Sequence, residues 1–404
     1  MKKKIFVGIF LVSLISSALT LGLVCFLLDL NTKNAFELGR FFAAMRFIEG
    51  HYVQEVERGK LIDGAIGGMV NSLGDPHSIY LAPKLYSQLR AETSGTFGGI
   101  GVYMSFKNGG VQIMNVIPDS PGYKAGLLAG DEILAVDGQP IEEISPGEVA
   151  IKIRGEVGTQ VELLIGREGY DDTTYTLTRE NIKVKTVAGK MIEDKLGYIK
   201  ISSFSESTGE EFKSTLAELE RAGMKGFVLD MRQNPGGVIT SCIEIAKELV
   251  PAGTIASVIQ RDGQKEVFTS ELPSAKFPII ILLDKNSASA AELLSGALQD
   301  TKVALVVGEK SYGKGSVQTL IPMMHEDGLK LTIAKYYTPN GRSIDGEGIS
   351  PDVEVSLIET PNQMYEINNL DAERDPQLAT AENLLRHQVD EGKILFDDDF
   401  WKTS

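Results

Sequence analysis

The sequence predicts an α/β protein with a mostly parallel-sheet core, an inserted strand-rich module, a helical N-terminal region and an N-terminal transmembrane helix. Strand and helix patterns alternate from residue 197 onward, which is typical of a parallel sheet. Short apolar strands separated by tight turns fill residues 95–178. Residues 5–28 carry no charge, so they form an apolar run long enough to span a bilayer.

Length and composition indicate a globular protein of several domains. A chain of 404 residues exceeds one ordinary core. We place the predicted segments at residues 1–30 (signal anchor), 31–94 (helical), 95–178 (module), 179–356 (core) and 357–404 (acidic C-terminal extension). Hydrophobic residues make up 43% of the chain and charged residues 24%, as in ordinary globular proteins.

Charge and cysteine content exclude some classes of function. The net charge is −15, so a nucleic-acid partner is not expected, because phosphate binding needs a basic face. The two cysteines, Cys25 and Cys242, lie far apart in the sequence. They predict neither a disulfide framework nor a zinc site, and we expect no metal and no cofactor.

The N-terminus predicts attachment to a membrane. Lys2, Lys3 and Lys4 precede the apolar run and favour a cytoplasmic N-terminus. The expected location is therefore the cell membrane, with a single pass and everything after residue 31 outside the cytoplasm. The alternative is a cleaved signal and a secreted form, although signal peptides usually have an apolar region of about 7–15 residues.

Residues 35–92 are expected to be helical. Phe41, Phe42, Met45, Phe47 and Ile48 form an amphipathic stripe. This stripe could pack on a second copy of the chain, giving a homodimer, or on the chain's own core.

The alternating region should carry a site at one edge of its sheet. Predicted strands are residues 198–202, 226–231, 255–260, 277–283 and 303–307, and predicted helices are 209–222, 240–249, 290–299 and, in the acidic extension, 379–388. Polar loops at 232–237, 285–289 and 308–315 each follow a strand. The carboxyl ends of parallel strands meet at one edge, where such folds place their sites. The acidic run at residues 397–399 is interpreted as a solvated tail.

Ser289 allows two interpretations. With Glu292 three residues later it fits a capping box that opens a helix. It could also be a nucleophile at the mouth of that helix, and Ser287 is a second candidate. Gly236 and Gly237 follow Pro235, so their N–H groups could stabilise an oxyanion, with the Ala290 N–H as a further donor.

A serine nucleophile needs a base, and Lys314 is our candidate. None of the four histidines lies in a loop of the predicted edge. A lysine can replace histidine when burial favours its neutral amine. Gln318, four residues later on an extended segment, could orient it. The alternative is a lysine on a surface loop.

The chain resembles the carboxy-terminal processing peptidases, or tail-specific proteases, from about residue 35 to 356. The resemblance rests on an ordered set of motifs: Gly74-Asp75-Pro76-His77-Ser78-Ile79-Tyr80, Phe97-Gly98-Gly99-Ile100-Gly101-Val102, Ala125-Gly126-Leu127, Gly130-Asp131-Glu132-Ile133, Leu229-Asp230-Met231-Arg232-Gln233-Asn234-Pro235-Gly236-Gly237, Ser287-Ala288-Ser289-Ala290, Tyr312-Gly313-Lys314-Gly315 and Ala334-Lys335-Tyr336-Tyr337-Thr338-Pro339. His77, Gln233 and Ala291 depart from common family residues, and none of these departures removes a catalytic group.

The resemblance implies residue roles and a function. Ser289, not Ser287, would be the nucleophile, Lys314 the base and Gln318 its orienting partner. The strand-rich module would be a PDZ domain that binds peptides at its carboxylate-binding loop, with the residues Gly99, Ile100, Gly101 and Val102, while Arg154 assists.

The expected function is a serine endopeptidase outside the cytoplasm. It would recognise unfolded or C-terminally exposed protein substrates through the PDZ domain and cut them with a Ser/Lys dyad, through an acyl-enzyme. The alternative is a non-catalytic PDZ scaffold or chaperone for envelope proteins.

Overall fold

The chain divides into two compact units, Met1–Tyr80 and Leu81–Ser404. The structure is a computed structural model, and it describes residues 12–17, 20, 32–107, 110–143, 146–356, 370 and 372–391. In the first unit, two helices follow each other, α2 (Thr32–His51) and α3 (Arg58–Asn71). They agree with the helical pattern predicted for this region. A short strand, β1 (Ile79–Leu81), spans the boundary between the units.

The predicted membrane span, residues 5–28, lies largely outside the described residues. Of that segment the structure describes residues 12–17 and 20, which are helical. Among the residues described, no helix has the length and apolar character needed to cross a bilayer.

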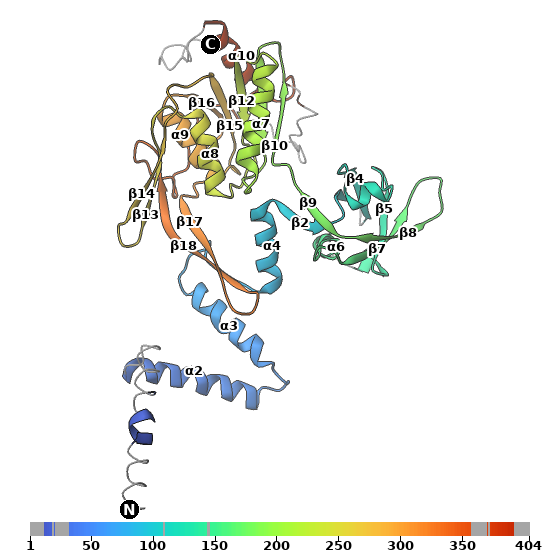
Figure 1. Cartoon of the computed structure of the whole chain (residues 1–404), viewed down its shortest axis with the longest axis vertical. Coiled ribbons are helices and arrows are strands. Elements are labelled where there is room, and N and C mark those ends of the chain that lie inside the picture. The colour runs from blue at the N-terminus through green and yellow to red at the C-terminus, as the bar shows by residue number, and fades with distance from the viewer. Residues whose placement is uncertain are drawn as a thin grey trace, which may run out of the picture. The chain divides into compact units, whose positions relative to one another are not determined.

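The second unit is built on a six-stranded sheet with one antiparallel edge (Figure 1). Its strands, in spatial order, are β10 (Val187–Met191), β11 (Leu196–Ile201), β12 (Gly226–Asp230), β15 (Ile279–Leu283), β16 (Ala304–Gly308) and β19 (Val353–Glu354). Only β10 runs antiparallel to its neighbour. Strands β12, β15 and β16 are buried at every residue, as central strands covered on both faces must be.

Helices cover both faces of this sheet. Along each strand, successive side chains pack on opposite faces. One face packs on α7 (Thr208–Arg221), α8 (Ile239–Leu249) and α9 (Ala290–Asp300), through side chains such as Leu229 and Ile281. The other packs on α10 (Pro376–Glu391), through side chains such as Val228 and Ile280. The period of two follows from strand geometry. The helix predicted at residues 379–388 is thus part of the core, whereas residues 397–399 lie outside the described chain.

The prediction of a mostly parallel core is right for this sheet and wrong for a second one. The second sheet contains β13 (Gly253–Gln260), β14 (Lys265–Ser270), β17 (Ser316–Pro322) and β18 (Gly328–Tyr337), and the pairs β13–β14, β13–β18 and β17–β18 are all antiparallel. The sequence pattern predicts residues 255–260 as a strand of the parallel sheet. Their strand is instead joined to β14 by residues 261–264, and a connection this short permits only an antiparallel hairpin.

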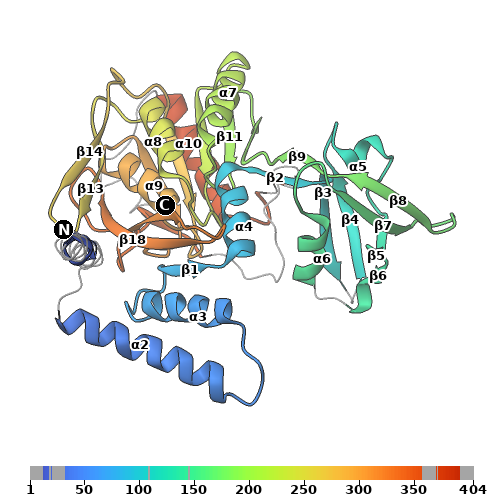
Figure 2. The same ribbon diagram turned by 60° about the horizontal axis from the view of Figure 1, so that its bottom comes forward.

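The strand-rich module is inserted through a pair of adjacent strands (Figure 2). Helix α4 (Pro83–Ser94) leads into β2 (Thr96–Gly99), which pairs antiparallel with the returning strand β9 (Glu180–Lys183). Between them lies a sheet of β3 (Val102–Lys107), β4 (Gly110–Val116), β5 (Glu132–Val136), β6 (Gln139–Pro140), β7 (Gln160–Gly166) and β8 (Thr173–Thr178), with α5 (Pro121–Lys124), a 3₁₀ turn (Ile141–Glu143) and α6 (Pro146–Ile153). Strand β3 stands at an edge of this sheet.

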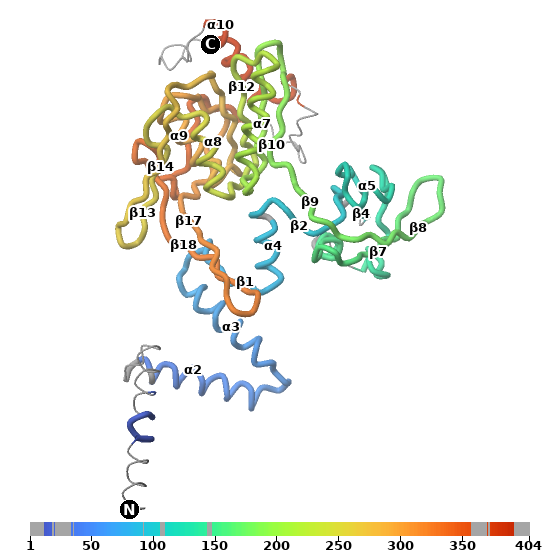
Figure 3. The backbone as a smooth tube through the Cα atoms, in the orientation of Figure 1, coloured from blue at the N-terminus to red at the C-terminus, as the bar shows by residue number. Residues whose placement is uncertain are grey.

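The three predicted loops do leave the same edge of the parallel sheet. Strands β12, β15 and β16 are parallel neighbours, with Leu229 beside Ile281 and Ile281 beside Val306. Their carboxyl ends therefore point the same way. Figure 3 traces the course of the backbone through this unit. The loops after these strands are brought together because of this register.

A buried ionic cluster joins the C-terminal segment to the carboxyl end of β12. The guanidinium of Arg232 donates to Asp230 at 2.7 Å and to Asp375 at 2.7 Å, and the Tyr198 hydroxyl donates to Asp230 at 2.6 Å. Burial alone would raise the pKa of Asp230, but the charges of Arg232 and Lys200 and the bonds from Arg232 and Tyr198 outweigh it and hold that pKa well below its usual range.

Replacement of Arg232 by Met is expected to destabilise the protein strongly. It would leave the carboxylates of Asp230 and Asp375 without their guanidinium, and breaking a buried ion pair costs about 3–5 kcal/mol. Urea unfolding of the purified chain, followed by circular dichroism, measures the loss.

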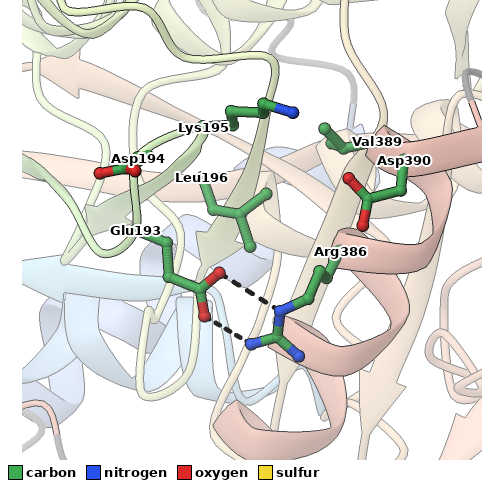
Figure 4. A pocket seen from close by; sticks show the side chains of 7 residues that line it. All are labelled: Glu193, Asp194, Lys195, Leu196, Arg386, Val389 and Asp390. Atoms are coloured by element: carbon green, nitrogen blue, oxygen red, sulfur yellow. Dashed lines mark hydrogen bonds and ion pairs between the residues drawn. The ribbon is translucent and has the colours of Figure 1, made fainter.

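Arg386→Met is the matched control for this experiment. Arg386 pairs with Glu193 beside a surface cavity (Figure 4), where both side chains are 40% exposed or more. Exposed pairs contribute about 0–1 kcal/mol. Equal losses in the two variants would contradict a structural role for the buried cluster.

Candidate active site

Ser289 occupies a strained position immediately before α9. Its φ is 55° and its ψ is −115°, a conformation that costs a non-glycine residue on the order of 1–3 kcal/mol. Hydrogen bonds on both sides hold it there. The Ala288 N–H donates to the Asn234 carbonyl at 2.9 Å, and the Ser289 N–H donates to Glu292 Oε2 at 2.7 Å. The capping interaction predicted from the sequence thus fixes the backbone of this serine.

Ser287 and Ser289 have different surroundings. Ser287 is fully buried, and its hydroxyl lies 2.9 Å from both the Met231 carbonyl and Asp284 Oδ1. Ser289 lines a cavity, and the side chain of Tyr336 lies in the same lining. Ser287 is therefore part of the wall that supports the loop, while Ser289 faces the space where a substrate could lie.

Tyr336 is a site residue that the sequence reasoning missed. It lies on β18, is 2% exposed, and its backbone N–H donates to the Gly315 carbonyl at 2.8 Å. Burial raises the pKa of its hydroxyl. The hydroxyl therefore stays protonated, and it lies in the lining of the cavity that Ser289 also lines. A tyrosine in a β-strand pattern carries no signal for such a position.

The buried carboxylate of Glu292 binds the loop that contains Lys314. Glu292 is 0% exposed and accepts the Ser311 hydroxyl at 2.6 Å, the Gly313 N–H at 2.6 Å and the Lys314 N–H at 2.8 Å. The same carboxylate accepts the Ser289 N–H. One side chain thus fixes the backbones of both Ser289 and Lys314. Its place in the first turn of α9 also suits an anion, because the helix dipole is positive there.

Lys314 and Gln318 line the same cavity as Ser289. Lys314 is partly buried, and the glycine after it cannot be replaced, since a Cβ at Gly315 would lie 2.2 Å from the Asp345 nitrogen. The Nε2 of Gln318 donates to Ser316 Oγ at 2.8 Å and to Thr332 Oγ1 at 3.2 Å. A bond from Gln318 to a lysine ammonium would therefore have to use its carbonyl oxygen.

The glycine loop after β12 lies directly against the start of α9. A Cβ at Gly236 would come within 2.7 Å of the Ser289 Cβ, and one at Gly237 would fall 2.0 Å from the Phe204 carbonyl oxygen. Both residues also have positive φ, of 91° and 138°. The N–H of Gly236 is already bound to Asn234 Oδ1 at 2.8 Å. Three N–H groups were candidates for binding an oxyanion. One of them, that of Gly236, instead donates to Asn234 within its own loop.

The cavity of about 740 Å³ extends beyond these loops. Its lining includes Leu89 and Thr93 from α4, Phe97 from β2, Phe204, and Leu320 and Lys330 from the β17–β18 hairpin. This volume lies within the range of ligand-binding clefts. The second cavity, drawn in Figure 4, contains none of the predicted site residues, and its charged side chains are those of a solvated surface.

The predicted peptide-binding residues fall in two places. Gly99 ends β2, Ile100 and Gly101 join it to β3, and Val102 begins that strand. The carbonyls of Ile100 and Gly101 accept bonds from inside the module, from Gly122 and Ile117. Arg154 lies elsewhere, in the lining of the cavity, with its guanidinium carbon 4.3 Å from the ring centre of Phe97.

Family comparisons agree with this arrangement. Residues 195–355 match peptidase family S41, residues 112–167 match a PDZ domain, and residues 29–84 match the N-terminal domain of the activating protease CtpB.

Two relatives with protease names support the same family. The chain is 38% identical over 336 residues to the carboxy-terminal-processing protease of Bartonella bacilliformis, covering 80% of this chain and 76% of the relative. It is 34% identical over 362 residues to the carboxy-terminal processing protease CtpA of Bacillus subtilis, covering 88% and 77%. A solved photosystem II D1 C-terminal processing protease is 28% identical, with a TM-score of 0.46 over 78% of this chain and 92% of that one. The chain therefore belongs to the carboxy-terminal processing proteases, the serine-type peptidases of family S41 that carry a PDZ domain.

Proposed function

We propose that the protein cuts peptide bonds with Ser289 as nucleophile and Lys314 as general base. The observation that carries this proposal is the common anchor of the two residues: their backbones are bound to one buried carboxylate, and both line one cavity. Attack of Ser289 Oγ on the substrate carbonyl transfers the serine proton to the neutral amine of Lys314. The C–N bond then breaks, the amine product leaves with that proton, and an acyl-enzyme remains. Water activated by the same lysine releases the acid product.

The oxyanion would be bound by the N–H groups of Gly237 and Ala290. Ala290 begins α9, so its N–H is among those left without a partner by the helix itself. Donors placed where charge develops are often the largest catalytic contribution. We assign Gly236 a different part, because its N–H is bound to Asn234: its lack of a side chain lets the loop approach Ser289.

Substrates are proposed to be unfolded or C-terminally exposed polypeptides. Strand β3 is an edge strand, preceded by the turn that contains Gly99, Ile100 and Gly101. An extended peptide can add to such an edge and place its terminal carboxylate against backbone N–H groups. Arg154 would contact the chain farther on, since it lies in the lining of the catalytic cavity.

We further propose that the protein is a membrane-anchored homodimer that acts outside the cytoplasm. The apolar run at residues 5–28 after three lysines supports the anchor, and the exposed Phe36, Phe42 and Phe47 of α2 support self-association. Cross-linking of intact cells followed by membrane fractionation should give a species of twice the chain's mass in the membrane fraction. A soluble monomer would refute both.

Replacement of Ser289 or Lys314 by Ala is expected to abolish cleavage of an unfolded protein with an apolar C-terminus. Loss of either member removes the nucleophile or the base, and such losses lower kcat by several orders of magnitude, about 10⁴-fold or more. Fragment masses measured over time report cleavage.

Lys310→Ala is the matched control, because Lys310 is an exposed lysine of the same loop. It should leave the rate unchanged. Cleavage retained in both dyad variants would refute the mechanism. An unmodified chain that binds the substrate but never cuts it would favour the scaffold alternative.

Glu292→Gln is expected to lower kcat about a hundredfold while KM changes little. Oε2 accepts from the N–H groups of Ser289 and Lys314, and Oε1 accepts from Ser311 and Gly313. An amide keeps one acceptor oxygen, so one of these two pairs of donors loses its acceptor. The loop that carries Lys314 then shifts, and displacements of about 1 Å can cost this much. The value of KM should change little because Glu292 is not among the residues that line the cavity.

Steady-state kinetics on one peptide measures both constants. Glu220→Gln, an exposed residue of α7 with the same change of charge, serves as control. A rise in KM at unchanged kcat would contradict a positioning role for Glu292.

A further inference from the structure

The catalytic cavity has a charge opposite to that of the chain. The protein carries 55 acidic and 40 basic residues, for a net charge of −15. The described residues that line the cavity nevertheless include Arg154, Lys314 and Lys330, and no Asp or Glu. A cleft lined by charges of one sign raises the local concentration of ligands of the other sign. The cavity is therefore suited to an anionic group on the polypeptide it receives.

Of the three cationic residues described in the cavity lining, Lys330 has no role in the proposed reaction. Lys314 is needed as a neutral base, and Arg154, which packs on the ring of Phe97, is already proposed to contact the substrate chain. Lys330 is partly buried on β18. Among the residues described, no carboxylate pairs with it, whereas Lys335 on the same strand is bound to Asp345 at 2.8 Å. Its charge is thus held at the cavity without a partner from the described chain.

The register of the hairpin places Lys330 on the same face as Gln318. Gln318 pairs with Thr332 and Leu320 pairs with Lys330, so these four residues share one face of the hairpin. The bond from Gln318 to Thr332 confirms that face. Two residues along a strand span about 7 Å. Lys330 therefore lies about two residues of extended chain beyond Gln318.

We propose that Lys330 forms a subsite for a carboxylate of the substrate, close to the bond that is cut. The group would be either an Asp or Glu side chain or the terminal α-carboxylate, since both present the same two oxygens to an ammonium. The proposal rests on the peptidase function proposed above. It is separate from the PDZ turn, because Gly99, Ile100 and Gly101 are not in the cavity lining.

Peptide binding to the full-length chain tests the subsite without requiring cleavage. The background is Ser289→Ala, and fluorescence anisotropy measures Kd for short labelled apolar peptides in two arms. In one arm the C-terminus is amidated and a single Glu or Gln is moved along the peptide. In the other arm the side chains are neutral and the C-terminus is free or amidated. We expect one arm to show about tenfold tighter binding of the carboxylate form, the gain typical of a charged hydrogen bond.

The double variants identify Lys330 as the cause. Adding Lys330→Gln should bring the ratio of the first arm close to one. In the second arm, where the PDZ turn also binds a free terminus, it should lower the ratio about tenfold if the chain end is the ligand. Lys330→Arg should preserve the ratio in either arm. Lys265→Gln, an exposed lysine of β14, should leave the ratio unchanged. A preference that depends on Lys330 in the first arm assigns the site to a substrate side chain. A preference that depends on Lys330 in the second arm assigns it to the chain end.

Two results separate this inference from the proposed function. A carboxylate preference in neither arm, or one that Lys330→Gln leaves unchanged, overturns the subsite even if the Ser289 chain cleaves peptides. A preference lost in Lys330→Gln upholds the subsite even if the Ser289 chain cleaves nothing, and in that case only the peptidase reaction fails.

Discussion

The site depends on the carboxylate of Glu292 more than on any other single group. It accepts hydrogen bonds from the backbone of Ser289 and from the loop that carries Lys314, so it sets the separation of two residues that lie on different loops. A buried carboxylate is tolerated only where donors replace its water. Four donors do so here, and at the start of α9 the helix dipole assists them. The strained backbone of Ser289 is held within the same set of bonds.

Much of the fold follows from periodicity. The buried strands β12, β15 and β16 are continuous apolar runs followed by polar loops, and the parallel register brings those loops to one edge. What periodicity does not give is the partner of each strand. Residues 253–260 have the composition of a buried strand, but the short turn after them, and pairing with β18, place them in an antiparallel sheet. The docking of α10 was equally hidden, because its sequence is polar and acidic apart from a narrow apolar stripe.

The sequence predicted that three candidate residues lie close together, but not the directions in which their polar groups point. The resemblance to known motifs named Ser289, Lys314 and Gln318, and the fold brings all three to one cavity. The sequence indicated the bond between Glu292 and Ser289, since a capping box is local. It could not indicate the bonds to Ser311 and Gly313, which join distant loops. Likewise, glycine at 236 predicts freedom of the backbone but not that its N–H turns to Asn234.

The link between Arg232 and Asp375 has a consequence for the order in which the protein is made. Arg232 precedes the glycine loop by a few residues, while its partner lies 143 positions later in the chain. A nascent chain that has not yet reached Asp375 holds an arginine whose burial is not fully offset. The loop that contains Gly236 and Gly237 thus gains its full support only after Asp375 has been synthesised. The support of the glycine loop therefore forms later than the segments that carry Ser289 and Lys314, both of which precede Asp375 in the chain.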